Sequence, residues 1–285
     1  MVPTLSLSGL DILWIQVAGT LCNLRCAHCL VSSGPGDDRH AMMPREDVLG
    51  LVAEASARGV REVYFTGGEP LLHPDIEGLC ESTLERLPLT VLTNGMLVSE
   101  ARAARFGSIF ARARFSLEIR VSLDAMDPEA NDRIRGRGNF EAAVEGIRRL
   151  VRHGLHPIVT TVELEAGLGS PQGRAALLAF LARLEIPRPR LKILPLFPVG
   201  REVDRSGPAP IRARLREGDL DGDALARLPC ATSRIVTSRG VYACPIRIDD
   251  PDAFAGETLD VATGPIRLSS PACYTCHASG ATCAT

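Results

Sequence analysis

The chain has 285 residues, of which 45% are hydrophobic, and its 32 basic side chains nearly balance its 34 acidic ones. This length fits one barrel-sized domain, or a barrel with a small appendage, and leaves room for a sizeable core. Because the charge is nearly balanced, there is no basic field for a polyanion, and we expect no nucleic-acid partner.

The N-terminal segment MVPTLSLSGLDILWIQVAG lacks a basic region and carries Asp11 within its apolar part. No run of about 18 uncharged apolar residues occurs along the chain. We therefore expect a cytoplasmic protein with no membrane partner. Nine cysteines, an odd number grouped towards the two ends, favour metal or redox chemistry over a disulfide framework.

Short apolar runs typical of strands alternate with longer amphipathic runs. The expected strands are 12–19, 60–68, 89–95, 117–125, 156–163 and 190–197, and expected helices include 45–59, 75–87 and 139–154. In the last helix, Phe140, Val144 and Ile147 share one face, and Gly154 ends it. Parallel strands need helical crossovers, so this alternation predicts an α/β fold with a partial (β/α)6 TIM-type barrel over residues 1–205.

The alternation stops near residue 200. Residues 206–229 are rich in Pro, Gly, Arg and Asp and are expected to form a linker or a surface helix. Residues 230–285 are expected to form a small cysteine-rich module. It contains a β-hairpin that turns at 238–240 and a loop-rich tail ending in CYTCHASGATCAT.

Cys22, Cys26 and Cys29 follow the first expected strand, where parallel α/β folds bind their ligands. Taken alone, the triplet fits a zinc site completed by His28 or a distant cysteine, or an iron–sulfur cluster. The second expected strand ends in the sequence GGEP at 67–70, at the same end of the sheet. Glycines there allow the backbone to approach a ligand closely.

C-x3-C-x2-C after the first strand, with GGEP after the second, strongly resembles the radical S-adenosylmethionine (SAM) superfamily over about residues 10–200. The resemblance implies that Cys22, Cys26 and Cys29 hold three irons of a [4Fe-4S] cluster. The fourth iron then binds SAM, and reductive cleavage of SAM gives a 5′-deoxyadenosyl radical. The same resemblance places Gly67, Gly68 and Glu69 at the methionyl part of SAM. His28 would shield the cluster or contact adenine, although simple loop packing also accounts for it.

The segment RVSLDAMDPEANDRIRGRG resembles the fourth-strand region of such enzymes. The likeness assigns Ser122 and Arg135 to polar groups of SAM, with Arg133 or Arg137 as alternatives for the arginine. Ala125 stands where the family often has Gly. We treat Asp124 as a candidate catalytic residue that contacts substrate, or else as a turn-forming Asp.

FPVGR at 197–201 resembles the sixth-strand end of the same enzymes, and TNG at 93–95 ends the third expected strand. In the first, Gly200 is expected to approach adenine and Arg201 to face substrate. In the second, Asn94 either lines the site or favours the turn. Cys80 has no expected chemistry and is interpreted as a core residue.

Four C-terminal cysteines can close a cluster or a zinc site, namely Cys230, Cys244, Cys273 and Cys276. Attached to a radical SAM core, they resemble the auxiliary-cluster module called twitch, a short relative of the SPASM module. That likeness implies a second [4Fe-4S] cluster. Cys283 is left as a replacement ligand, as a catalytic hydrogen donor to a substrate radical, or as an idle tail residue.

From these features we expect an enzyme that oxidises or epimerises a sugar-like or aminocyclitol-like small molecule. We also expect it to receive electrons from an external donor such as flavodoxin or ferredoxin. Because only a short segment precedes the first strand, we expect no N-terminal peptide-recognition domain. The main alternative is a maturase of a ribosomally made peptide that works with a separate recognition protein. A non-catalytic zinc-binding protein is the remote alternative.

Overall fold

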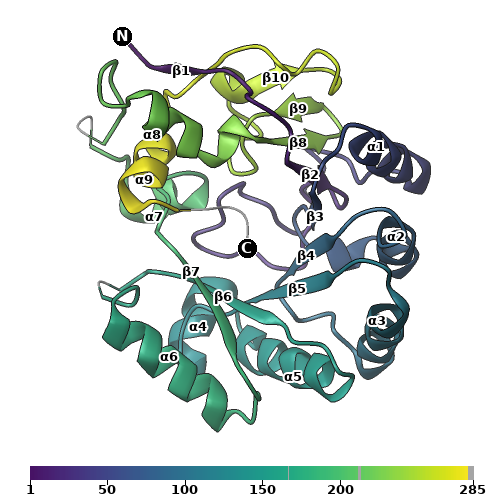
Figure 1. The fold of residues 1–285 in the computed structure, drawn as a ribbon. Helices are drawn as coiled ribbons and strands as arrows, with labels where there is room; N and C mark the ends of the chain where they lie inside the picture. Colours follow the sequence, from purple (N-terminus) through teal and green to yellow (C-terminus); the bar gives the residue numbers. More distant parts are fainter. Residues whose placement is uncertain (166, 211–212, 282–285) are drawn as a thin grey trace.

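The computed structural model describes residues 1–165, 167–210 and 213–281. Within them the main sheet has nine strands in the order β10-β9-β8-β2-β3-β4-β5-β6-β7. Neighbouring strands from β2 to β7 are parallel, and they curve around a central space (Figure 1). Each lies inside one of the six predicted ranges: β2 (Ile12–Gln16), β3 (Glu62–Thr66), β4 (Leu89–Thr93), β5 (Leu117–Ser122), β6 (Ile158–Val162) and β7 (Arg190–Leu194). The predicted partial barrel is confirmed.

Helices cover the outer face of this sheet (Figure 1). Several begin at a polar side chain that accepts a backbone N–H bond, as Ser99 does for α3 and Asp127 for α4. The helices that accompany the barrel strands are α1 (Arg45–Ala57), α2 (Ile76–Thr83), α3 (Glu100–Arg112), α4 (Pro128–Arg135), α5 (Asn139–Arg152) and α6 (Pro171–Arg183).

Strand side chains alternate between the helices and the barrel interior. Leu13 and Phe65 point outward into the main hydrophobic core, which the helices complete. Trp14 and Tyr64 point inward and stack with ring centroids 4.1 Å apart. The inward face also carries polar groups, so the interior of the barrel is chemically distinct from its outer core.

The C-terminal part is joined to the barrel by backbone pairing. β8 (Ser233–Thr237) pairs antiparallel with β9 (Gly240–Tyr242), which confirms the predicted hairpin. β8 also runs parallel to β2 and thereby extends the barrel sheet, a pairing that local sequence patterns do not reveal. β10 (Phe254–Gly256) follows at the edge, and the N-terminal β1 (Thr4–Leu5) pairs with β11 (Ile266–Arg267).

The tail differs from the expected loop-rich segment, because its CYTC sequence lies in a helix, α9 (Pro271–Ser279). Ser270 caps the first turn through the Ala272 N–H, and Pro271 begins the helix with a suitable φ. Gly280 ends it with φ +61°. The expected linker contains α8 (Gly222–Arg227), and α7 (Arg201–Ser206) precedes it.

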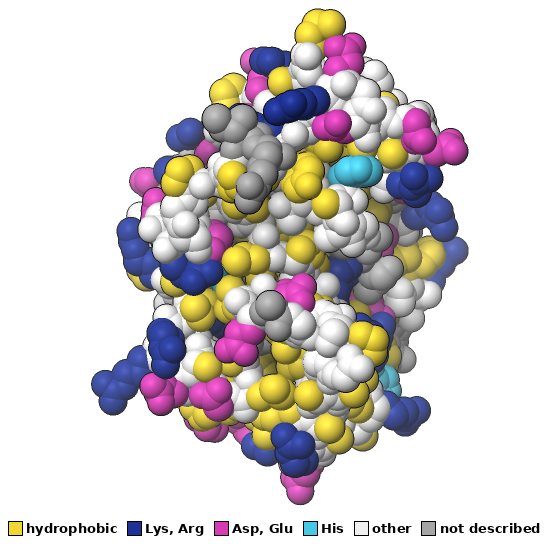
Figure 2. Space-filling model, turned by 90° about the vertical axis from the view of Figure 1, so that its left-hand side faces the viewer, with side chains coloured by type: hydrophobic (Ala, Val, Ile, Leu, Met, Phe, Trp, Pro, Cys, Tyr) yellow, Lys and Arg dark blue, Asp and Glu magenta, His cyan; other side chains and the backbone are white. Residues whose placement is uncertain are grey.

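Surface charge is mixed on the face shown in Figure 2. Basic and acidic side chains are interspersed there, and hydrophobic side chains reach the surface across the middle. In the described part of the chain, no helix is long and apolar enough to cross a membrane.

Candidate active site

Residues 17–44 join β2 to α1 and form what we call the three-cysteine loop, which the GGEP segment holds in place. The Gly68 N–H donates to the Gly19 carbonyl at 2.8 Å, and the Glu69 N–H donates to the Leu21 carbonyl at 2.9 Å. A Cβ on Gly68 would lie 2.1 Å from the Leu21 carbonyl oxygen, and Gly67 has φ +144°. Both glycines are therefore needed for the loop to pack against the end of β3.

The Glu69 side chain is buried and ties the end of β3 to the end of β4. Its carboxylate accepts bonds from the Leu71 N–H at 3.0 Å, the Thr93 hydroxyl at 2.7 Å and the Asn94 N–H at 2.7 Å. Burial raises the pKa of Glu69, and these donors oppose that rise. In the structure Glu69 thus braces the site through protein donors, and its contact with SAM stays a prediction.

The three thiols lie close enough to influence one another. Burial raises the pKa of Cys22 to about 12, and the neighbouring Cys26 and Cys29 add to this rise. The Leu24 N–H points at the Cys22 sulfur at 3.4 Å, and the Asn94 amide lies 3.9 Å from it. A buried thiol of this kind ionises readily only when a cation accepts its charge.

Asp124 joins two other predicted site residues in a buried cluster. Its Oδ2 lies 2.6 Å from His28 Nε2 and 2.6 Å from Arg135 Nε, and its Oδ1 accepts the Val162 N–H. Although burial alone would raise the pKa of Asp124, Arg135 and His28 hold it well below its usual range. His28 is therefore anchored by a specific partner rather than by loop packing alone.

His28 belongs to the three-cysteine loop, and Arg135 gives the cluster a second link to that loop. The Cys26 thiol donates to the Arg135 carbonyl at 3.6 Å, and the Ala27 N–H donates to the Ile134 carbonyl at 2.7 Å. Burial raises the pKa of Cys26, while the Arg135 guanidinium opposes that rise. Arg135 therefore places a positive charge beside a thiol that would carry negative charge once metallated. Its contact with SAM, like that of Ser122 at the end of β5, remains a prediction.

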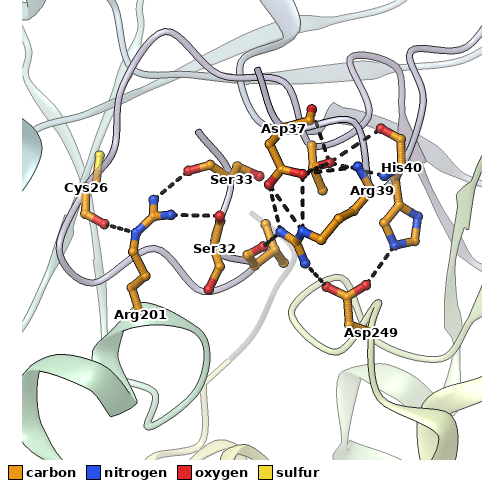
Figure 3. A network of polar contacts seen from close by, with 10 residues as sticks. Cys26, Ser32, Ser33, Asp37, Arg39, His40, Arg201 and Asp249 are labelled. Carbon is orange, nitrogen blue, oxygen red and sulfur yellow. Dashed lines mark hydrogen bonds and ion pairs between the residues drawn. The ribbon is translucent and has the colours of Figure 1, made fainter. Parts of the chain in front are cut away.

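Gly200 and Arg201 at the start of α7 also hold the three-cysteine loop. Gly200 has φ +59°, and a Cβ there would lie 2.3 Å from the Cys29 carbonyl oxygen. The expected substrate-facing role of Arg201 is wrong, because its guanidinium points at the backbone of the loop (Figure 3). It donates to the carbonyls of Cys26 at 2.8 Å, Ser32 at 2.7 Å and Ser33 at 2.5 Å.

A second set of contacts links the same loop to the C-terminal module (Figure 3). Arg39 pairs with Asp37 within the loop and reaches Asp249 at 2.5 Å. Asp249 also pairs with His40 Nε2 at 3.0 Å. The loop is thus held from the barrel by Arg201 and from the module by Asp249.

The C-terminal cysteines come together although they lie on separate segments. Cys230, Cys244, Cys273 and Cys276 all line one small hollow, which we call the four-cysteine pocket. Apolar residues, including Ile266 and Leu268, form much of the rest of its lining. The fold therefore brings together the four C-terminal cysteines that were expected to share a site.

The two remaining cysteines differ in what the structure says of them. Cys80 is buried in α2 and belongs to the main core, as expected, and burial raises its pKa. Cys283 lies outside the described residues. Asn94, whose role the sequence left open, lies at the loop: its amide donates to Asn23 Oδ1 at 2.8 Å.

Comparison with known proteins identifies the family. The sequence model of the Radical SAM superfamily matches residues 17–164, which is just over half of the chain. The protein belongs to the radical SAM superfamily.

Individual relatives are more distant. A GTP 3′,8-cyclase from Petrotoga mobilis is 31% identical over 164 residues, covering 55% of this chain and 49% of the relative. The mycofactocin maturase MftC from Mycolicibacterium smegmatis is 28% identical over 260 residues, covering 80% of this chain and 63% of the relative. The chain spans about half the length of the first curated relatives it matches.

Among solved structures, Streptococcus suis SuiB bound to its precursor peptide SuiA shares the fold with a TM-score of 0.65 at 16% identity. The alignment covers 91% of this chain and 66% of SuiB, so the shared fold extends beyond the barrel into the C-terminal part.

The residues present fit a [4Fe-4S] cluster that binds SAM. In the described residues, no group of three or more His, Cys, Asp or Glu side chains is arranged for a single metal ion. The three-cysteine loop offers instead three thiols, an N–H directed at Cys22 and the Arg135 charge near Cys26. Thiolate ligands with nearby donors are the environment such clusters use.

Proposed function

We propose that this enzyme cleaves SAM at a [4Fe-4S] cluster held by Cys22, Cys26 and Cys29, and then oxidises or epimerises a polar small molecule. The loop that carries these thiols is fixed on three sides, by GGEP, by Arg201 and by Asp249. When bound, SAM and the cluster would supply a 5′-deoxyadenosyl radical that removes a hydrogen atom from substrate. The chain's contribution is to hold the thiols rigidly and to keep the buried charges around them paired.

The choice of a polar small molecule rests on the name of one relative, because the charged groups inside the barrel are paired with one another. Arg120 points inward from β5 and lies 5.1 Å from the centre of the Tyr64 ring. Tyr64 donates its hydroxyl to Glu62 at 2.9 Å, and the Thr90 hydroxyl donates to the same carboxylate at 2.7 Å. Tyr64, Thr90 and Arg120 are buried, and Glu62 and Thr90 lie at the amino-terminal ends of β3 and β4, so these contacts brace the barrel. The relative from Petrotoga mobilis is named for a reaction of GTP, which is also a polar small molecule.

The second part of the proposal is an auxiliary [4Fe-4S] cluster in the four-cysteine pocket. Four thiolates would complete its coordination, so it would not bind SAM, and it is suited to accept the electron left after hydrogen abstraction. Its support is the convergence of the four cysteines on one apolar hollow. An external donor such as flavodoxin or ferredoxin would reduce the SAM-binding cluster.

Cys283 remains a proposed hydrogen donor for an epimerisation. The residues just before it, Ser279 to Ala281, line a hollow along the edge strand β7 together with Lys192 and Arg174. A Cys283→Ala enzyme that still incorporates solvent deuterium at the parent rate would contradict the donor role.

A second candidate function is maturation of a ribosomally made peptide with a separate recognition protein. The match to MftC favours it, because that relative is named a maturase and aligns over 80% of this chain. The two candidates differ in what the enzyme binds. Saturable binding of a leader peptide, with turnover only on the attached precursor, would support the maturase and contradict the small-molecule proposal.

The reaction is tested by turnover of candidate sugars and aminocyclitols in deuterated water, with deoxyadenosine and product mass followed together. Oxidation gives a product that has lost two hydrogens. Epimerisation gives a product of otherwise unchanged composition that has gained one solvent deuterium. Deoxyadenosine formation that no polar small molecule stimulates would contradict the proposed substrate class.

A further inference from the structure

Arg247 is a buried arginine that contacts the four-cysteine pocket. Its side chain is only 2% exposed, and its Nη1 donates to the Cys273 sulfur at 3.3 Å. It lies between β9 and η3 (Pro251–Ala253), two residues before Asp249. An arginine so fully withdrawn from water requires negative charge nearby.

The protein provides part of that charge. Asp250 Oδ2 accepts from Arg247 Nε at 2.9 Å and from Nη2 at 2.7 Å. The Arg267 carbonyl and the Ser269 hydroxyl accept two further bonds, at 3.1 and 3.3 Å. The guanidinium is thereby fixed in one orientation, with one Nη1–H bond left for the Cys273 sulfur.

The electrostatic coupling runs in both directions. Burial raises the pKa of the Cys273 thiol, and the Arg247 charge opposes that rise. Burial alone would lower the pKa of Arg247, but the Cys273 sulfur, Asp250 and the Cys244 sulfur raise it above its ordinary value. Arg247 therefore holds a fixed positive charge 3.3 Å from the Cys273 sulfur.

Arg247 also borders the region between the two cysteine sites. It lines the four-cysteine pocket and a second hollow, whose wall includes Leu30 and Ser32 of the three-cysteine loop and Gly200. A charge at this position acts on the pocket from the side that is shared with the three-cysteine loop.

We propose that Arg247 is a positioning residue that sets the reduction potential of the auxiliary cluster by donating a charged hydrogen bond to Cys273. This inference rests on the proposed function, because it requires a cluster in the four-cysteine pocket. A cluster gains one negative charge on reduction, and a fixed cation and donor at a ligand sulfur stabilise the reduced form more than the oxidised form. Arg247 therefore raises the potential, which makes the cluster a better acceptor for an electron from a substrate radical.

The test measures the potential of the auxiliary cluster alone. The full chain carries Cys22→Ala, Cys26→Ala and Cys29→Ala, so that only the four-cysteine pocket can hold iron. Redox titration followed by electron paramagnetic resonance compares this parent with Arg247→Gln and Arg247→Lys. Arg267→Gln is the matched control, because Arg267 belongs to the same module but is 58% exposed and pairs with Asp252.

At the potential that half-reduces the parent, we expect the ratio of reduced to oxidised cluster to fall about tenfold in Arg247→Gln, or about 59 mV for one electron. Arg247→Lys keeps the charge and should stay close to the parent, as should the control. Loss of the cluster from Arg247→Gln alone would show that the charge is needed to hold the cluster, and it would overturn the assignment to the potential.

Three further results would overturn the assignment. They are an unchanged ratio in Arg247→Gln with a full complement of iron, equal shifts in the Gln and Lys variants, and loss of the cluster from both, which would mean a structural role only. A parent that takes up no iron would instead overturn the proposed auxiliary cluster. The two failures are therefore distinguishable.

Discussion

Arg201 donates three hydrogen bonds to the three-cysteine loop, so its removal should loosen that loop locally. Arg201→Met keeps much of the apolar stem and deletes three hydrogen bonds to the carbonyls of Cys26, Ser32 and Ser33. A bond with a charged partner contributes about 1.5–3 kcal/mol. Because Arg201 is only partly buried, water replaces part of this, and we expect a net loss of about 3 kcal/mol.

The assay is native-state hydrogen exchange of the amides in residues 22–33. At about 1.4 kcal/mol per tenfold, a 3 kcal/mol loss should speed their exchange roughly 100-fold, whereas amides in β4 and β5 should change little. Arg205→Met is the matched control, because Arg205 lies in the same helix, is partly exposed and pairs with Glu202 of that helix. Exchange in the loop that rises less than about threefold, or rises equally in the control, would refute the reasoning.

Three other substitutions probe the contacts that brace the site. Gly68→Ala would force a Cβ towards the Leu21 carbonyl, and iron analysis should show loss of the first cluster with the second retained; full iron loading would contradict this. Asp124→Asn leaves Arg135 buried without its counter-charge and should lower the free energy of unfolding by about 3–5 kcal/mol in a denaturant titration, and a loss below about 1 kcal/mol would contradict the buried pair. Glu69→Gln turns an amide N–H2 towards backbone donors and should cost about 2–3 kcal/mol in the same titration, with no loss contradicting its bracing role.

The barrel strands could be predicted because each one is encoded by the hydrophobic pattern of a few neighbouring residues. Each of the six strands lies within its predicted range, since buried parallel strands are short apolar runs between amphipathic helices. The pairing of β8 with β2 was missed because it joins segments more than 200 residues apart. The helix at Pro271–Ser279 was missed because its two cysteines and short length obscured the capping signals at Ser270 and Gly280.

The candidate site shows the same division. Cysteine spacing and GGEP selected the residues around the first cluster, and cysteine count selected the four-cysteine pocket. The contacts of Arg201 and Arg247 could not be predicted, because the local sequence around an arginine does not indicate which distant residue it contacts. Arg201 binds the carbonyl of Cys26, 175 positions away, and only the folded chain brings them together.

The central claim is that the two cysteine sites hold two [4Fe-4S] clusters and that the first cleaves SAM. Its most direct test is anaerobic reconstitution of the full chain, with iron and sulfide analysis and measurement of 5′-deoxyadenosine after adding a reductant. We predict about eight irons per chain and reductant-dependent deoxyadenosine that disappears in Cys26→Ala. A colourless protein that binds about two zinc ions and leaves SAM intact would contradict the claim.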